Sequence, residues 1–217
     1  MSEPQTAQGP ESPPPSRVER RRARVRQRIV EAAEDLTESR GVDGVTIEDI
    51  TEAADVARRT FYHYFESKND VVVPIARART RELNRRIDRV VEDVDDPADV
   101  VSIALRHTLR SLPEDPLCAW FIFRSGLPQQ RLLEGIGESG TRDVGRGIES
   151  GRFALANAEA ASSLLGGAMI GALSGRLEGT LDDADLDDAV EYLLRLLGVP
   201  AGEAQEIAHR PLPPLGD

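Results

Sequence analysis

The segment from Thr46 to Asp70, TIEDITEAADVARRTFYHYFESKND, constrains the fold more than any other part of the sequence. Its first half carries apolar residues at intervals of three and four, which is the spacing of one buried helix face. These residues are Ile47, Ile50 and Ala53 or Ala54. Asp55, a residue type that tolerates a left-handed backbone, then precedes a stretch of about two further helical turns, from Ala57 to His63. The segment therefore predicts two short helices joined by a tight turn.

Two capping boxes mark helix starts in this segment. Thr46 is followed by Asp49, and Ser67 by Asp70, at the spacing that lets side chains satisfy free backbone N–H groups at a helix start. The second box predicts a long helix that begins near Ser67 and places Lys68 at its N-terminus. The positive end of the helix dipole favours a phosphate there.

The second short helix is expected to turn hydrogen-bond donors outward. Phe61 falls on its inner face, and donors suited to phosphates and base edges surround it. These donors are Arg58, Arg59, Thr60, Tyr62 and His63. The pattern is typical of a DNA-recognition helix, although spacing alone leaves open the alternative that the aromatic helix pair is only hydrophobic core.

The string TIEDITEAADVARRTFYHYFESKNDV resembles the DNA-binding signature of the TetR family of bacterial transcriptional regulators. The likeness is specific from about Arg24 to Val71, roughly a quarter of the chain. It implies an all-α fold, with an N-terminal three-helix DNA-binding domain containing a helix-turn-helix and a larger C-terminal helical ligand-binding and dimerisation domain. It also implies DNA contacts at Thr46, Arg58, Arg59, Thr60, Tyr62, His63 and Lys68.

Two positions depart from the family pattern. Asp55 stands where glycine is usual in the turn, and Ala57 stands where serine is common at the start of the recognition helix. Because Ala57 has no side-chain oxygen, a cap worth about 1 kcal/mol and one phosphate contact are expected to be missing. The N-terminal arm would then carry more of the binding.

The charge distribution also indicates DNA. The 217-residue chain has a net charge of −11, and this total, taken alone, argues against nucleic-acid binding. Seven arginines and one glutamate between Arg17 and Arg28 nevertheless give a local charge of +6, which leaves −17 for the rest. We expect this arm to contact the minor groove or the phosphates, chiefly through Arg20, Arg21, Arg22 and Arg24. A solvated charge run or an RNA-binding tail is the alternative.

Composition and length suggest two structured domains. We expect a disordered tail over 1–16, the helix-turn-helix DNA-binding domain over 17–66, the ligand-binding and dimerisation domain over 67–199, and a loose C-terminal tail over 200–217.

No apolar run reaches the roughly 20 residues that span a bilayer, so a cytoplasmic protein without membrane contact is expected. No catalytic, phosphate-binding or paired-cysteine motif is found, which predicts neither an enzyme nor a cofactor or metal.

The helix from Ser67 is expected to link the two domains, with Pro74 either interrupting it or tolerated in its second turn. A further helix is predicted from Asp99 to Leu112. Glycines recur over 135–151, and each costs about 1 kcal/mol inside a helix, so we expect a kinked or broken helix there.

The only tryptophan and two phenylalanines lie between Leu117 and Leu127, which makes this segment the richest candidate lining for a small-molecule pocket. The residues predicted to bind a ligand are His107, Trp120, Phe121, Phe123, Arg124, Met169 and Tyr192. Plain hydrophobic core is the alternative for each of them.

Two C-terminal helices, over 157–179 and 185–197, carry the predicted dimer interface. The first has glycines at four-residue spacing, a bare face that only a closely approaching partner covers. The resemblance implies that the last two helices form a four-helix interface in a homodimer. The predicted interface residues are Leu164, Gly167, Ala168, Gly171, Ala172, Gly175, Val190, Leu194 and Leu197. Packing of these faces within one subunit is the alternative.

Together these features predict a ligand-responsive DNA-binding transcriptional regulator. In its expected form, a repressor dimer binds a palindromic operator in double-stranded DNA and is released by a small-molecule inducer. The alternative is a dimeric module that binds a small molecule or a partner without recognising an operator.

Overall fold

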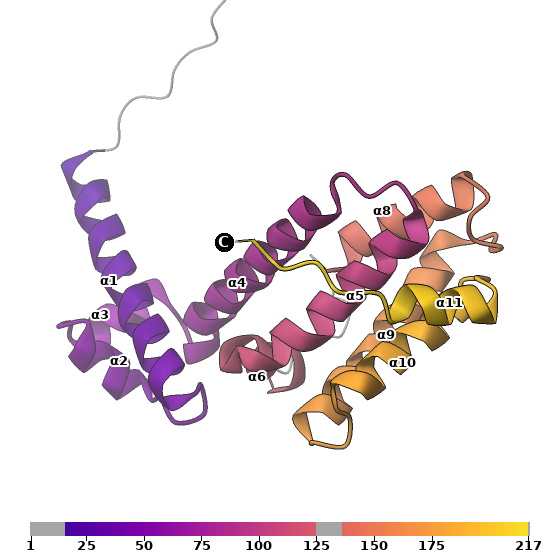
Figure 1. The fold of residues 1–217 in the computed structure, drawn as a ribbon. Coiled ribbons are helices and arrows are strands. Elements are labelled where there is room, and N and C mark those ends of the chain that lie inside the picture. The colour runs from indigo at the N-terminus through magenta and orange to yellow at the C-terminus, as the bar shows by residue number, and fades with distance from the viewer. Residues whose placement is uncertain (1–15, 125–135, 217) are drawn as a thin grey trace, which may run out of the picture.

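The computed structural model describes residues 16–124 and 136–216, and within residues 136–138 it describes the backbone only. All regular structure in these two ranges is helical, which confirms the all-α prediction (Figure 1). The helices are α1 Arg17–Arg40, α2 Ile47–Ala53, α3 Arg58–Tyr64, α4 Lys68–Val91, α5 Pro97–Glu114, α6 Pro116–Arg124, α8 Ile136–Glu149, α9 Ala158–Leu177, α10 Asp183–Leu196 and α11 Ala201–Ala208. None of the described helices is both long and apolar enough to cross a bilayer.

Local signals define the N-terminal three-helix domain. Side chains cap α2 and α4 through the two predicted boxes, Thr46 with Asp49 and Ser67 with Asp70. Asp55 adopts a φ of 50°, the left-handed conformation expected in the turn before α3. The N-terminus of α3 has no side-chain cap, as predicted from Ala57. The buried faces of α1, α2 and α3 then close on a shared apolar cluster.

Helix α4 joins this domain to the rest of the chain (Figure 1). It runs unbroken past Pro74, because the bond that proline removes lies near the helix start and its ring is exposed. Val71 and Val72, near the start, belong to the N-terminal cluster, whereas Ile87 and Val91 are buried near the far end. A tilt of α4 at its far end therefore also displaces the N-terminal domain, which packs on its first turns.

Helix α6 is built into the junction between the two domains. Leu117 and Phe121 are buried in the N-terminal cluster, although they lie about 50 residues beyond that domain's helices. Arg79 of α4 reinforces the junction by bonding Glu34 of α1 at 3.1 Å and Asp115 at 3.3 Å. The DNA-binding domain is thus held by apolar packing and by partly exposed ion pairs.

We expect Phe121→Ala to destabilise the protein by about 3–5 kcal/mol, because the ring is only 2% exposed and its loss leaves a cavity. Phe123 lies on the same helix, is 38% exposed and provides the matched control. Chemical denaturation should give a large loss for Phe121→Ala and a change within about 0.5 kcal/mol for Phe123→Ala. Equal losses would contradict this packing of α6.

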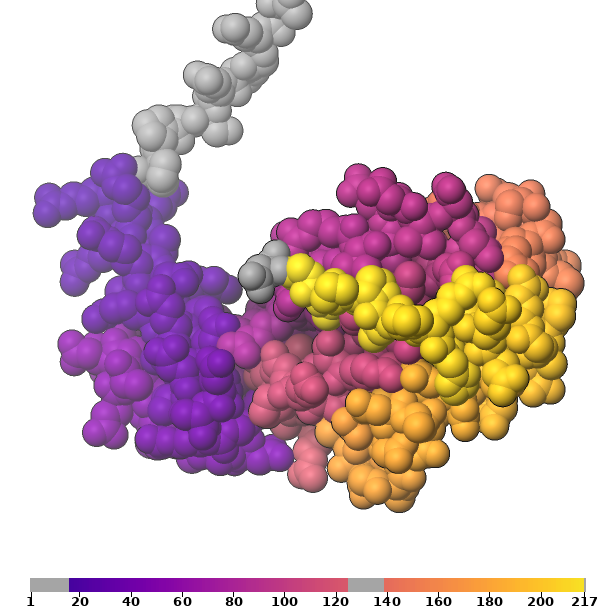
Figure 2. Space-filling model, viewed as in Figure 1, coloured from indigo at the N-terminus to yellow at the C-terminus, as the bar shows by residue number. Residues whose placement is uncertain are grey.

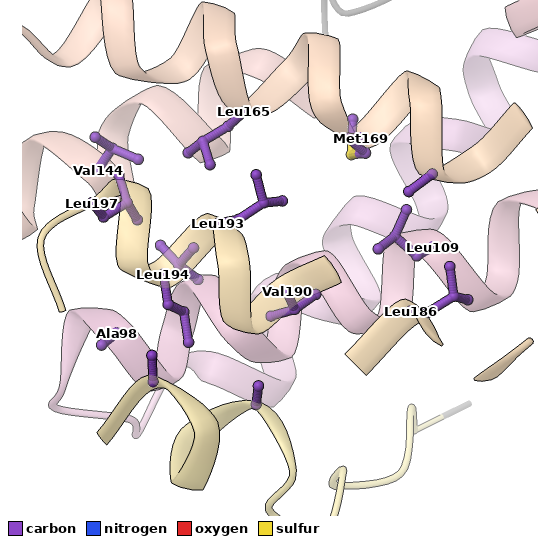
Figure 3. Close-up of a cluster of buried hydrophobic side chains, with 14 of the residues drawn as sticks. Ala98, Leu109, Val144, Leu165, Met169, Leu186, Val190, Leu193, Leu194 and Leu197 are labelled. Carbon is purple, nitrogen blue, oxygen red and sulfur yellow. The ribbon is translucent and has the colours of Figure 1, made fainter. Parts of the chain in front are cut away.

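The larger core lies between α5, α8, α9, α10 and α11. Figure 3 shows its side chains converging from these helices. Val190, Leu194 and Leu197, predicted at a dimer interface, are completely buried inside this single subunit. That part of the predicted interface is wrong, because the apolar stripe of α10 packs against its own chain.

Two predictions about irregular structure are also wrong. Residues 200–217 were expected to be loose, but α11 packs Ala204, Ile207 and Ala208 into the core. The following segment crosses α5 and reaches α4, where the Arg86 Nε donates to the Gly216 carbonyl at 2.8 Å (Figures 1 and 2). The glycine-rich segment was expected to be kinked or broken, but its described part has no break over Ile136–Glu149. Of the predicted tail over 1–16, only Ser16, which caps α1, lies within the described residues.

Candidate DNA-binding surface and ligand pocket

Helix α3 presents the predicted donors to solvent. Phe61 is fully buried and anchors the helix, which turns Arg59, Tyr62 and His63 outward, with Thr60 partly exposed. Arg59 makes no hydrogen bond or ion pair with any described residue. An anionic ligand that approached α3 would therefore meet a free guanidinium.

Two other predicted donors are already engaged within the chain. Arg58 pairs with Glu48 of α2 and lies over the Tyr62 ring, with its Cζ 5.7 Å from the ring centroid. The Lys68 Nζ donates to the carbonyls of Val42 and Val45, at 2.7 and 2.8 Å. The structure therefore places Lys68 as a brace for the loop before α2, since two of its three donors are used there.

Thr46 also has a structural role in this domain. Its hydroxyl bonds the Asp49 carboxylate and accepts the Asp49 backbone N–H. These bonds lower the pKa of Asp49, which keeps the capping carboxylate ionised. Contact of Thr46 with DNA stays a prediction.

The arginine cluster lies on a helix rather than on an extended arm. Ser16 and Glu19 form a capping box, so α1 is helical from Arg17 onward. Its first turns stand out beyond α2 and α3 (Figure 1). The predicted DNA-contacting arginines of these turns are all exposed: Arg20, Arg21, Arg22 and Arg24. Their charge extends the basic surface of the domain along α1.

A mostly apolar pocket of about 100 Å³ lies in the larger domain, between α4, α5, α8 and α9. Each helix contributes one face to it, as α4 does with residues at positions i, i+3, i+4 and i+7. The described lining consists of Asn84, Ile87, Asp88, Val91, Val101, Ala104, Leu105, Thr108, Ser139, Gly140, Thr141, Asp143, Val144, Ser162, Leu165, Gly166 and Met169.

Polar side chains reach this pocket from all four helices, as Asp88 on α4, Thr108 on α5, Asp143 on α8 and Ser162 on α9 do. Arg142 pairs with Asp88 of α4 at 3.1 Å and with Asp143 at 3.2 Å. Asp143 is 5% exposed, and its burial raises its pKa, an effect that the Arg142 guanidinium only partly offsets. On α9, the buried Ser162 hydroxyl has no hydrogen-bond partner among the described residues. The pocket thus combines an apolar body with carboxylates and one unpaired hydroxyl.

The structure does not bring the seven predicted ligand residues together. Only Met169 lines this pocket. The α6 residues serve the domain junction instead, where both the Trp120 Nε1 and Arg124 bond Asp43 of the N-terminal domain, at 3.2 and 3.3 Å. Phe121 is buried in that domain's cluster and Phe123 points to solvent. The aromatic residues of α6 therefore mark a contact between the two domains and not a ligand pocket.

The two remaining predicted residues lie elsewhere. The His107 Nε2–H donates to the Pro213 carbonyl at 2.9 Å, and burial lowers the pKa of this ring. Tyr192 is 59% exposed on α10. Sequence analysis missed Asp88, although Asn84, Ile87, Asp88 and Val91 form one helix face in which polar residues alternate with apolar ones. That pattern was the available signal for the pocket.

Exposed apolar and glycine residues lie on both α9 and α10. Of the predicted interface residues, Leu164, Gly167, Ala168 and Gly171 are exposed and Gly175 is partly exposed, whereas Ala172 is buried in the subunit core. A Cβ atom added at Gly167 or Gly171 would meet no atom within 4 Å, so the subunit's own packing does not require glycine there. Leu177 on α9, and Tyr192 and Leu196 on α10, are also exposed.

Comparison with known proteins matches both parts of this architecture. Residues 29–74 match the family described as bacterial regulatory proteins, tetR family, and residues 96–210 match the tetracyclin repressor-like C-terminal domain. The crystal structure of RolR in complex with resorcinol is 34% identical, with a TM-score of 0.81, and the match covers 91% of this chain and 99% of RolR.

Curated sequences give shorter matches. An uncharacterized HTH-type transcriptional regulator of Mycobacterium tuberculosis is 35% identical over 95 residues, which cover 43% of this chain and 47% of the relative. The HTH-type transcriptional repressor DhaR of Mycobacterium sp. strain GP1 is 36% identical over 76 residues, which cover 35% of this chain and 38% of DhaR. The chain thus spans about half the length, or less, of these curated relatives.

Proposed function

Because this chain belongs to the TetR family of bacterial regulatory proteins, we propose that it is a ligand-responsive transcriptional regulator acting as a homodimer. One observation carries the proposal. Helix α4 is shared by a domain that turns donors outward on α3 and by a separate domain that encloses an apolar pocket. A binding event at one end of α4 is thereby coupled mechanically to the other end.

On the DNA side, two copies of α3 would enter successive major grooves of a palindromic operator in double-stranded DNA. The exposed Arg59 and His63, with the arginines of α1, provide donors for phosphates and base edges. We propose repression as the mode of regulation, which the name of the similar DhaR repressor supports.

On the ligand side, we propose a small hydroxylated aromatic molecule as the inducer. A pocket of about 100 Å³ suits a ligand of one ring better than a larger one, since an apolar cavity of about 150 Å³ binds benzene. The buried Asp143 carboxylate would accept a hydrogen bond from a ring hydroxyl in place of water. The RolR complex with resorcinol supports the same ligand class.

Release from DNA would follow from α4. Asp88, Ile87 and Val91 face the pocket, so a bound ring pushes on the far half of the helix whose first turns pack in the DNA-binding domain. The spacing of the two α3 helices would then no longer match the groove period. A coupling free energy of about 1–3 kcal/mol is typical of such linkage.

Fluorescence anisotropy with DNA from the flanks of the protein's own gene tests this function. Resorcinol is expected to lower the operator affinity of the wild-type protein by about 5- to 150-fold, as that coupling implies. Asp143→Ala should abolish the response, because it removes the acceptor for the ring hydroxyl, whereas the exposed Asp93→Ala should respond like the wild type. Unchanged operator affinity at saturating resorcinol would refute this ligand class.

A dimeric module that binds ligand without an operator is the second candidate. It is favoured by the engagement of Arg58 with Glu48 and of Lys68 with backbone carbonyls, which removes two of the expected DNA contacts. Selection of bound fragments from genomic DNA separates the two functions. An enriched palindrome supports the regulator, and the absence of any enriched sequence supports the module.

A further inference from the structure

We propose that Ser162 is a specificity-determining residue of the ligand pocket, and that it binds a second hydroxyl group on the aromatic ring. The pocket would therefore select a dihydroxylated ring over a ring with one hydroxyl. This inference rests on the proposed ligand class. It assigns a role to a residue other than the two pocket carboxylates, Asp88 on α4 and Asp143 on α8.

The position of Ser162 on α9 directs it to the pocket. Ser162, Leu165, Gly166 and Met169 are spaced i, i+3, i+4 and i+7, and all four line the cavity. The other three members of this face are apolar or lack a side chain, so Ser162 is the one hydroxyl on the described α9 wall. A serine hydroxyl at such a position can hydrogen-bond a polar group of the ligand, whereas its apolar neighbours on α9 offer it no partner.

The hydroxyl of Ser162 has no hydrogen-bond partner within the described protein. Its Oγ is buried and has no partner among the described residues, not even a carbonyl of the preceding helical turn, which a helical serine commonly uses. Buried hydroxyls are nearly always hydrogen-bonded, because leaving one unpaired sacrifices its bonds to water. A ligand hydroxyl placed here would restore the missing bond.

The two pocket carboxylates and the Ser162 hydroxyl lie on different helices. Asp88 and Asp143 belong to α4 and α8, and Arg142 bridges them, whereas Ser162 belongs to α9. A rigid ring that bonds Asp143 through one hydroxyl needs a second hydroxyl to satisfy Ser162. A ring with a single hydroxyl bonded to Asp143 would leave Ser162 unpaired, and unpaired polar groups discriminate strongly between similar ligands.

Calorimetric titration of phenol and resorcinol tests this assignment. In the wild-type protein resorcinol is expected to bind more tightly than phenol, and Ser162→Ala should reduce this preference by about three- to tenfold, the value of one net hydrogen bond. Ser163→Ala is the matched control, since Ser163 is the exposed neighbour on the same helix and should leave the preference unchanged.

Thermal unfolding without ligand gives an independent readout. Ser162→Ala is expected to leave Tm unchanged or raise it, because the substitution removes an unpaired buried hydroxyl. A large fall in Tm would show that the hydroxyl is satisfied in the free protein and would overturn the inference. An equal preference in wild type and Ser162→Ala would also overturn it. Failure of both phenols to bind the wild type would instead refute the proposed ligand class, and the role of Ser162 with it.

Discussion

Replacing Gly171 by arginine is expected to produce a folded monomer whose operator affinity is lower by about two orders of magnitude or more, since linked half-sites gain that much from avidity. The reason lies in the bare face of α9. An added Cβ at Gly171 or Gly167 meets nothing within 4 Å apart from the adjoining residues and backbone of its own helix, and Leu164 beside them is 61% exposed. Such a face gains packing only from a closely approaching second copy.

Sedimentation velocity measures this effect directly, and circular dichroism checks the fold. Gly202→Arg is the matched control, because Gly202 is also exposed and an added Cβ there meets nothing within 4 Å, but it lies on α11. The control should remain a dimer. A dimeric Gly171→Arg protein would place the interface elsewhere on the molecule.

Arg59→Ala is expected to weaken operator binding by about 1–3 kcal/mol for each copy of α3, the range for an arginine that reads a base edge. Arg59 is exposed and makes no bond with a described residue, so its guanidinium meets DNA without first losing another contact. Arg58→Ala should cost less, because Arg58 must leave Glu48 before it binds a phosphate.

Anisotropy titrations over a range of salt concentrations distinguish the roles of these residues. Loss of a phosphate contact lowers the salt slope by about one per site, whereas loss of a base contact relaxes sequence preference. Arg85→Ala, on an exposed face of α4, should leave both unchanged. An Arg59→Ala protein that bound like the wild type would exclude α3 as the recognition helix.

The DNA-binding domain was predictable because its signals are local. Capping boxes at Thr46 and Ser67, the left-handed Asp55 and the uncapped Ala57 all behave as the sequence indicates, since each depends on neighbours within a few residues. Lys68 was predicted to contact a phosphate, but it bonds the carbonyls of Val42 and Val45. The sequence did not indicate these partners, because only the tertiary fold brings them near Lys68.

The larger domain was less predictable because its packing overrides local preference. The glycine-rich α8 stays helical, and one of its glycines is required by a contact with the turn that follows the helix. A Cβ at Gly147 would lie 2.1 Å from the Phe153 ring, so the ring occupies the space that a side chain would need. Helix propensity alone counts such a glycine only as a cost.

The aromatic residues of α6 illustrate a second limit of sequence analysis. Trp120 and Phe121 have the composition of a pocket lining, but composition does not distinguish a pocket from a domain junction. In the same way, the apolar stripe of α10 fitted either a dimer interface or a core, and Val190 and Leu194 belong to the core. Only the three-dimensional arrangement decides between such uses of the same residues.

Hydroxyl-radical footprinting of the dimer on its operator tests most directly whether two copies of α3 read DNA together. The expected result is two protected patches related by two-fold symmetry, with centres one helical turn apart, about 34–36 Å, or a multiple of that spacing. Both patches should disappear together in Arg59→Ala at a concentration that saturates the wild type. A single asymmetric patch, or protection that persists in that variant, would contradict a symmetric pair of recognition helices.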